Sequence, residues 1–327
     1  MKRILFAVAM FVSIGLSGVS AAQARLDGPL RLVVPYAAGG GAIDLTARAI
    51  QRSLEKRLGV PVVIENRPGA GTKIGTQAVM NATDGRTLII MSDPGWVGYY
   101  YTGLFDFKPW ERMTPIAQIS QSPYTVLTTS GRGNLDSWRK VIDKAKASGR
   151  PVAGGAPAAG GFSEMTFNEL MRRAGVPGIF VPYAGAGQAK VALLAGDIDF
   201  QIESGQAFQD IRQGQTRGVA ISTPERYRFA PDIPTFQELG IMDTLPTNTY
   251  SVWGPRGMDS TVVAAVAQAL REVAQDPEVV QILEERNAIE VRYRDAAEVK
   301  AYIEEMDRVW GPRLAAVRPG AAAKAGK

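Results

Sequence analysis

The stretch Arg31–Arg48, RLVVPYAAGGGAIDLTAR, sets the organisation of the chain. It opens with an apolar run typical of a buried strand and passes through three consecutive glycines. It then continues with apolar residues at every third or fourth position, which predicts a helix. A strand, a glycine-rich turn and a helix start point backbone N–H groups at a small anion. Glycine also removes the Cβ atoms that would keep an anion from the backbone. The stretch therefore predicts an α/β unit with an anion-binding loop.

Two later stretches repeat this order. The β-branched run Val62–Ile64 precedes the glycine-rich segment 69–75, and the short strand Val152–Ala153 precedes a glycine-rich segment at 154–161. In open α/β sheets, ligands bind beyond the carboxyl ends of the strands. We therefore expect these loops to face one cleft.

The first two glycine loops, Ala38–Gly41 and Gly69–Thr72, are expected to hold a ligand through their backbone amides, because neither run contains Arg or Lys. Lys73 follows the second loop and is a weaker candidate for this role. An alternative for Gly69 and Gly71 is that they only allow positive φ in a tight turn.

The N-terminal segment has the features of an export signal. Lys2 and Arg3 precede the apolar run Ile4–Leu16, which is short for a membrane span, and Ala22–Ala24 fits the small-x-small cleavage rule. We expect a signal peptide at 1–24, cleavage after Ala24 and a periplasmic location. A membrane anchor is the alternative.

The composition excludes several classes of protein. The formal net charge of +5 is small and the charges are scattered, so nucleic acid is not an expected partner. The chain contains no cysteine, which excludes disulfides and thiolate metal sites. It also contains no histidine, which excludes Ser-His-Asp and Cys-His catalysis and histidine zinc sites. We expect no metal, no cofactor and no catalytic residue.

The rest of the chain, about 300 residues, exceeds the usual size of a single core and predicts two domains. The order of expected strands and helices indicates that the chain crosses between them near 128 and 247. Domain 1 is expected to comprise 25–128 and 247–316, and domain 2 to comprise 129–246. The Ala/Gly/Lys-rich segment 317–327 is expected to be a flexible tail.

Seven ordered sequence blocks resemble the substrate-binding proteins of tripartite tricarboxylate transporters, the Bug-type periplasmic receptors. They span nearly the whole chain after Ala24. The blocks are VVPYAAGGGAIDLTAR, VVIENRPGAGTKIGTQAV, TDGRTLIIMS, MTPIAQI, FVPYAGAGQAKVALLAGDIDF, GVAISTPERYRFAPDIPTFQELG and VWGPRG.

The resemblance implies a two-lobed α/β fold like that of periplasmic binding proteins, each lobe a sheet flanked by helices, with the ligand cleft between the lobes. It implies a small organic carboxylate as ligand and the membrane permease subunits of such a transporter as partners. Three positions depart from the family pattern. The segment from Pro35 to Asp44 is one residue longer, Thr72 stands where glycine is common, and Ser163–Met165 replaces a region that often holds histidine.

The residues expected to contact the ligand lie in these loops and at strand ends. They are Tyr36, Ala38, Gly39, Gly40, Gly41, Asp44, Gly69, Ala70, Gly71, Thr72, Ser92, Gly155, Ser163, Tyr183 and Glu203. Asp44 has a structural alternative, an i,i+4 ion pair with Arg48. Tyr183 has packing as its alternative. Glu203 is expected either to accept a hydrogen bond from a ligand ammonium or hydroxyl group or to pair with a cation.

An aromatic-rich segment at 96–110 is expected to be either a cleft wall, through Trp96 and Tyr99, or a packed surface loop or partner contact.

Because the chain contains no histidine, ligand affinity should be nearly independent of pH between about 5 and 8, unless burial raises the pKa of Asp44 or Glu203.

The sequence as a whole predicts a monomeric periplasmic solute-binding protein that is not an enzyme and whose two lobes close around a carboxylate. The alternatives are an exported carboxylate sensor, an exported enzyme that uses Asp44, Glu203 and Tyr183, and a nucleotide-binding module. The last is disfavoured because the segment 69–75 misses G-x-G-x-x-G by one residue.

Overall fold

The computed structural model describes residues 26–39, 41–157, 161–183, 185–204, 207–243 and 245–316. Three predictions lie outside these residues: the signal peptide at 1–24 with its cleavage point, the role of Gly40, and the tail at 317–327.

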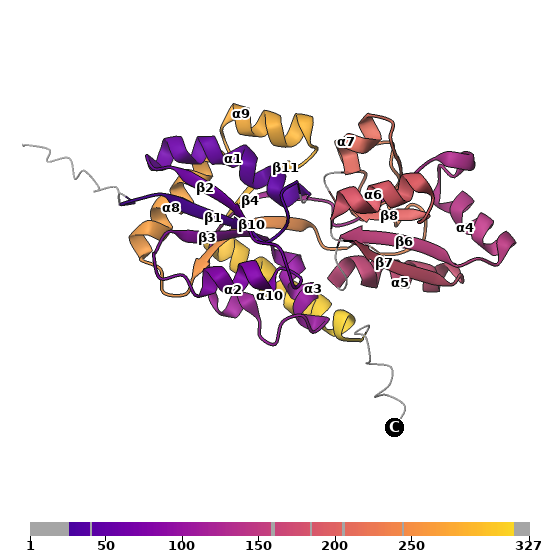
Figure 1. The fold of residues 1–327 in the computed structure, drawn as a ribbon, viewed down its shortest axis with the longest axis horizontal. Coiled ribbons are helices and arrows are strands. Elements are labelled where there is room, and N and C mark those ends of the chain that lie inside the picture. The colour runs from indigo at the N-terminus through magenta and orange to yellow at the C-terminus, as the bar shows by residue number, and fades with distance from the viewer. Residues whose placement is uncertain are drawn as a thin grey trace, which may run out of the picture.

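The described chain forms two lobes, each a sheet flanked by helices (Figure 1), which confirms the predicted α/β two-lobed fold. The sheet of the first lobe has the order β11-β4-β10-β3-β1-β2. In this sheet β1 runs parallel to β2 and β3, and β10 runs antiparallel to β3 and β4. Its strands are β1 (Leu30–Val34), β2 (Val62–Asn66), β3 (Thr87–Ser92), β4 (Met113–Ser122), β10 (Asn248–Pro255) and β11 (Glu290–Asp295).

Helices cover the sheet of the first lobe. They are α1 (Ala42–Leu58), α2 (Lys73–Met80), α3 (Asp93–Tyr101), α8 (Ser260–Val273), α9 (Pro277–Val280) and α10 (Ala296–Ala316), with the short helices η1 (Pro109–Glu111) and η3 (Gln281–Arg286). Helix α1 shows why the sequence pattern folds in this way. Its buried stripe of Ala47, Ile50 and Leu54 packs in the same core as β1, and Gly59 ends the helix in the left-handed conformation.

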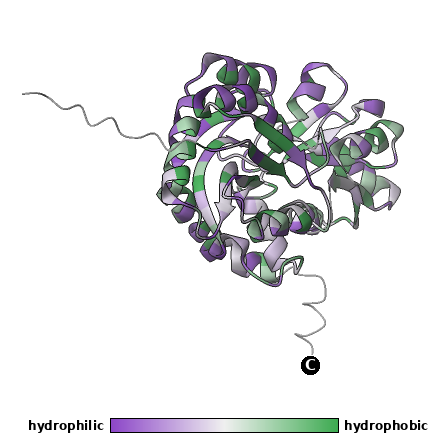
Figure 2. Ribbon diagram, turned by 60° about the vertical axis from the view of Figure 1, so that its left-hand side comes forward, coloured by the Kyte–Doolittle hydropathy of each residue, from purple (hydrophilic) through white to green (hydrophobic). Residues whose placement is uncertain are grey.

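The second lobe has a five-stranded sheet of order β7-β6-β8-β5-β9. Its strands are β5 (Val126–Thr129), β6 (Val152–Pro157), β7 (Gly178–Tyr183), β8 (Phe200–Glu203) and β9 (Arg217–Ile221). Its helices are η2 (Arg132–Asn134), α4 (Trp138–Ser148), α5 (Gly161–Ala174), α6 (Ala186–Ala195) and α7 (Ala207–Arg212). In Figure 2 the hydrophobic residues of both lobes are concentrated along the strands and on the helix faces turned toward them.

The first crossing between the lobes lies at 123–125, a few residues before the predicted point near 128. Strand β5 pairs with β8 and β9, so residues 126–128 belong to the second lobe and not to domain 1 as predicted. The sequence of a short apolar strand does not predict which sheet the strand joins, and here the pairing partners show it. At the return, Leu245 still donates its N–H to Ser222, and β10 begins at Asn248.

The lobes meet along α3 and α5. At Gly98 of α3 an added Cβ would lie only 3.1 Å from Gly161 Cα, so glycine allows the two helices to approach closely. Among the described helices, none combines the length and the apolar character that a membrane span requires.

Candidate functional site

A cleft with a volume of about 390 Å³ lies between the lobes. The first lobe contributes the loop between β1 and α1, one side of α3 with its N-cap Ser92, and the start of β10. The second lobe contributes the end of β6, the starts of α5 and α6, and the end of β8. The cleft is therefore formed mainly where strands give way to helices, as expected for an α/β binding site.

The first glycine loop lines the cleft, including Tyr36, Ala38, Gly39 and Gly41 of the predicted set. Gly39 and Gly41 have φ of 73° and 85°, a region that favours glycine. The first helical bond of α1 runs from the N–H of Leu45 to the carbonyl of Gly41. The N–H groups of Ala42 and Ile43, which both line the cleft, therefore have no acceptor within the helix and can bind an anion there.

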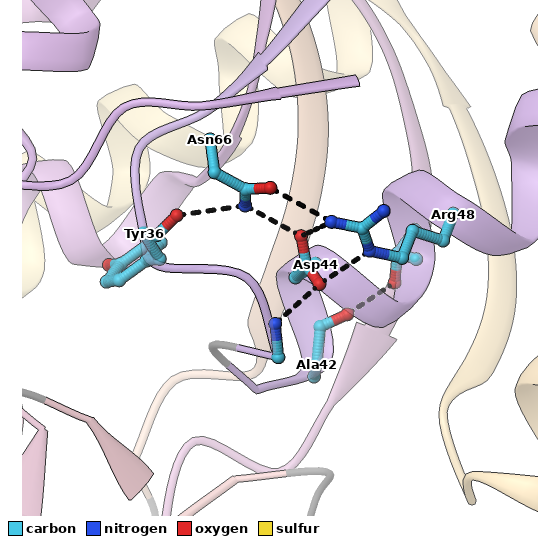
Figure 3. A network of polar contacts seen from close by, with 7 residues as sticks. Tyr36, Ala42, Asp44, Arg48 and Asn66 are labelled. Carbon is cyan, nitrogen blue, oxygen red and sulfur yellow. Dashed lines mark hydrogen bonds and ion pairs between the residues drawn. The ribbon is translucent and has the colours of Figure 1, made fainter. Parts of the chain in front are cut away.

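Asp44 does not line the cleft. It holds this loop in place through a network of polar contacts, which Figure 3 shows. The residue is 1% exposed, and its carboxylate accepts hydrogen bonds from Gly39 N at 2.9 Å, Asn66 Nδ2 at 2.8 Å and Arg48 Nε at 2.9 Å. Burial acts to raise the pKa of Asp44, but the hydrogen bonds outweigh it and lower the pKa below its usual value. The structure therefore shows Asp44 in the alternative role that the sequence allowed, the i,i+4 ion pair with Arg48.

Asn66 completes the clamp. Its Nδ2 also donates to the carbonyl of Tyr36 at 2.9 Å, and its Oδ1 accepts from Arg48 Nη2 at 2.9 Å. The end of β2 is thereby tied to both ends of the loop between β1 and α1. The main-chain path of the first glycine loop is fixed by a polar network that lies behind the cleft surface.

The second glycine loop, which the sequence predicts to hold the ligand, is not part of the cleft lining: Gly69, Ala70, Gly71 and Thr72 all lie outside it. All four residues have positive φ, which is the alternative role that the sequence left open for the glycines. The loop packs locally, since an added Cβ at Gly71 would lie 2.6 Å from Leu104 Cδ1. The physical reason is topological: β2 is the edge strand, and the cleft forms beside β1 and β3.

The start of α6 takes the place expected for the second glycine loop. Gly185, Ala186, Gly187 and Gln188 line the cleft from the second lobe. The first bond of α6 joins the N–H of Ala189 to Gly185 O at 3.3 Å, so the N–H groups of Ala186 and Gly187 have no acceptor within the helix. Sequence reasoning missed these ligand candidates, although the same strand–glycine–helix order at 178–187 was the available signal.

Ser163, in the first turn of α5, and Ser92, the N-cap of α3, both line the cleft as predicted. Ser92 Oγ accepts from Gly95 N and donates to Asn248 Oδ1 at 2.5 Å. Asn248 Nδ2 in turn donates to the Tyr250 hydroxyl at 3.0 Å. No sequence signal marked the last two residues as site residues, because they lie about 155 positions from Ser92 and meet it only through the pairing of β10 with β3.

Four tyrosines line the cleft and give it an amphipathic wall: Tyr250, described above, and three others. Tyr36, Tyr99 and Tyr124 all line it, and the hydroxyls of Tyr36 and Tyr99 lie 3.4 Å apart. Burial raises the pKa of all three phenols. Their hydroxyls therefore stay protonated at neutral pH and are able to donate hydrogen bonds to a ligand.

The aromatic segment at 96–110 is mostly a packed part of the core. It begins inside α3, and only Tyr99 of it lines the cleft. Trp96 is fully buried, donates Nε1 to Thr76 Oγ1 at 3.1 Å, and meets the Trp253 ring edge-on with the ring centres 5.3 Å apart. The suggested role of Trp96 in the cleft is therefore corrected.

Gly155 and Tyr183, both predicted to contact the ligand, also lie outside the cleft lining. They pack against each other on neighbouring strands: a Cβ at Gly155 would lie 2.7 Å from Tyr183 Cε2 and 2.6 Å from Ile198 Cδ1. Glycine at 155 makes room for the tyrosine ring, which is the packing alternative for Tyr183.

Glu203, at the end of β8, lines the cleft as predicted. The residue is 7% exposed, and burial raises the pKa of its carboxyl to about 7. Among the described lining residues it is the only Asp, Glu, Lys or Arg. The described part of the cleft lining therefore offers backbone amides, hydroxyls, side-chain amides and one carboxyl group, and it contains no side-chain cation.

Comparison with known proteins identifies the family. The model of the tripartite tricarboxylate transporter family receptor matches residues 46–317. Protein BugT of Bordetella pertussis is 31% identical over 296 residues, which are 89% of this chain and 90% of BugT.

Two solved structures share the fold. The periplasmic binding protein BugD has a TM-score of 0.81 at 24% identity, covering 90% of this chain and 99% of BugD. R. palustris Rpa4515, solved with adipate, has a TM-score of 0.80 at 24% identity over the same shares of the two chains. The family match, the relative and the shared two-lobed fold agree, and the chain belongs to the tripartite tricarboxylate transporter receptor family.

Proposed function

We propose that this protein is a periplasmic solute-binding protein that captures a small organic carboxylate in the cleft and delivers it to the permease subunits of a tripartite tricarboxylate-type transporter. The observation that carries the proposal is the pairing of two helix starts. The N-terminus of α1 in the first lobe and that of α6 in the second line the same cleft. Their backbone N–H groups form an anion site without a lysine or arginine.

The relatives support this assignment. The family is one of transporter receptors, and a solved structure with the same fold holds adipate, an organic acid. The geometry adds a reason for lobe closure, because a carboxylate held by donors from both lobes is bound most strongly when the lobes are together. The cleft has no paired acid and base or side-chain cation among its described lining residues, which favours binding over catalysis.

Proline substitution at the first helical position tests the amide grip. Proline is tolerated there, because its fixed φ suits the helix and its missing N–H has no partner within the helix. Ala42→Pro in α1 and Ala186→Pro in α6 each remove one N–H group from the cleft. Ser260→Pro is the matched control, since Ser260 is the exposed first residue of α8, outside the cleft lining.

A thermal-shift screen of organic acids on the wild-type protein first identifies a ligand, and isothermal titration then gives its affinity. One charge-assisted hydrogen bond is worth roughly 1.5–3 kcal/mol, so each cleft variant should bind about tenfold to hundredfold more weakly. The control should bind as the wild type does. Normal binding by both cleft variants, verified as folded by circular dichroism, would refute the amide grip. Absence of binding by any organic acid would refute the function itself.

A further inference from the structure

Glu203 is an acidic group in a cleft that is proposed to bind an acid. The other described lining residues are glycine, alanine, proline, isoleucine, serine, tyrosine, asparagine and glutamine, and none of them carries a charge at neutral pH. A ligand whose carboxylate is bound by backbone amides therefore meets a second negative group within the same space. Two carboxylates that are shielded from water repel each other strongly.

The carboxyl group of Glu203 is only partly satisfied by the protein. Its Oε1 accepts from Ser204 N at 3.1 Å, and its Oε2 accepts from Gln201 Nε2 at 3.1 Å. An ionised carboxylate has about four acceptor sites, so acceptor capacity remains for a donor in the cleft. The packing around it supplies one side-chain donor and one backbone donor, and both are neutral.

The charged groups nearest to Glu203 neutralise each other. Lys190 on α6 and Asp210 on α7 form an ion pair at 2.9 Å, and their effects on the pKa of Glu203 have opposite signs. The hydroxyl of Tyr250, on β10 in the opposite lobe, also lies within electrostatic range of Glu203. In the part of the chain that the structure describes, no lysine or arginine forms an ion pair with Glu203.

Glu203 faces the proposed carboxylate site across the cleft. Its Oε1 lies 3.9 Å from the position that a Cβ on Gly41 would occupy, although the two residues belong to different lobes. Gly41 is the N-cap of α1, the helix whose first amides are proposed to hold the ligand. A ligand bound there must therefore place another of its atoms close to the Glu203 carboxyl group.

We infer that Glu203 is a specificity-determining residue, and that the cleft takes a monocarboxylate that also carries a hydrogen-bond donor, an ammonium or hydroxyl group, in preference to a dicarboxylate. This inference rests on the proposed carboxylate-binding function and names the ligand class of the same site. The ammonium group is the better donor, because it supplies a positive charge that the lining lacks. The hydroxyl group can donate to Glu203 without a change in charge.

Two panels of acids test the preference, each built on one carbon chain. The first is butyrate, 4-hydroxybutyrate, 4-aminobutyrate and succinate. The second is propionate, lactate, alanine and malonate, which moves the second group next to the carboxylate. Affinities are measured by isothermal titration at pH 8, where Glu203 is mostly ionised. The variants are Glu203→Gln, which keeps the shape and removes the charge, and the control Glu225→Gln, at an exposed position of the same lobe.

In at least one panel, the wild type should bind the ammonium or hydroxyl acid at least tenfold more tightly than the unsubstituted acid, and the dicarboxylate most weakly. Glu203→Gln should abolish the ammonium preference and improve dicarboxylate binding at least tenfold, and Glu225→Gln should change neither. The inference is overturned if the wild type prefers the dicarboxylates, or if Glu203→Gln leaves the ranking unchanged. Failure of every acid to bind the wild type would instead refute the proposed function, and this inference with it.

Discussion

Replacing Asp44 by asparagine should disable the first glycine loop. The side chain keeps its shape, but all three partners of the carboxylate are donors: Gly39 N, Asn66 Nδ2 and the Arg48 guanidinium. A carboxamide would have to turn its own NH₂ group toward at least one of them. The substitution therefore removes accepted hydrogen bonds and leaves a buried donor without an acceptor.

The loss of stability expected for Asp44→Asn follows from the same contacts. A hydrogen bond to a charged group is worth roughly 1.5–3 kcal/mol, and the bonds from Gly39 and Asn66 belong to this class. The Arg48 side chain is 47% exposed, so its ion pair contributes about 1 kcal/mol or less. We expect Asp44→Asn to lower the free energy of unfolding by about 2–4 kcal/mol, and the melting temperature by roughly 5–10 °C.

The assay combines thermal unfolding with ligand titration. Glu304→Gln is the matched control, because Lys300 and Glu304 form an exposed i,i+4 pair on α10 that should be worth less than about 0.5 kcal/mol. Asp44→Asn should also weaken ligand binding at least tenfold, since the amides of α1 lose their fixed position. A variant that melts and binds like the control would refute the clamp.

Acid titration checks the sign of the electrostatic contribution. Folding lowers the pKa of Asp44 below its usual value, so this group stabilises the protein above that value and the contribution is lost as the pH falls through the lowered pKa. The difference in stability between wild type and Asp44→Asn should therefore be full at neutral pH and shrink below about pH 4. A difference that grows in acid would contradict this assignment.

Three further predictions concern the cleft and its surroundings. Folding raises the pKa of Glu203 to about 7, so the ligand-free protein should lose stability as the pH rises toward and through 7 and this group ionises. Glu203→Gln should remove this loss of stability, as measured by thermal unfolding at a series of pH values. Affinity for 4-aminobutyrate should rise from pH 5 to 7, by at most about tenfold per unit, and that for succinate should fall; flat titration profiles for both acids would contradict this. Tyr99→Phe should weaken ligand binding, as measured by isothermal titration. Trp96→Ala should instead lower the free energy of unfolding in urea by about 3–5 kcal/mol. The reverse pattern would count against the assigned places of the two rings. Gly155→Ala should destabilise by about 1–3 kcal/mol because its Cβ would overlap Tyr183, with unchanged ligand affinity; a loss of affinity without a loss of stability would place Gly155 in the site.

The first half of the site could be predicted from sequence because its signal is local. Glycines between a strand and a helix produce the turn at Gly39 and Gly41 wherever the unit lies in the fold, and both residues line the cleft. The same local pattern at Gly69–Thr72 failed, because a pattern does not reveal that β2 is the edge strand. The loop 185–188 has the same pattern and does line the cleft, but its sequence does not distinguish it from the loop at 69–72.

The remaining errors also concern contacts between distant parts of the chain. The sequence does not place Asn66, the distant partner of Asp44, and therefore does not reveal that the Asp44 carboxylate is occupied by the protein itself. Asn248 and Tyr250 reach the cleft only because β10 returns from the second lobe.

Because the chain contains no histidine, the sequence predicts a ligand affinity that is nearly independent of pH between about 5 and 8, unless burial raises the pKa of Asp44 or Glu203. Burial raises the pKa of Glu203 to about 7 and that of Asp93 to about 6.

The most direct test of the central claim is to observe the backbone amides during ligand binding. Amide proton and nitrogen shifts of the isotopically labelled protein should be followed by NMR during titration with the tightest-binding acid of the two panels. The account predicts the largest downfield proton shifts at Ala42, Ile43, Ala186 and Gly187, and little change at residues 69–72, which lie outside the cleft lining. Large shifts at 69–72 with unmoved amides at the starts of α1 and α6 would contradict it.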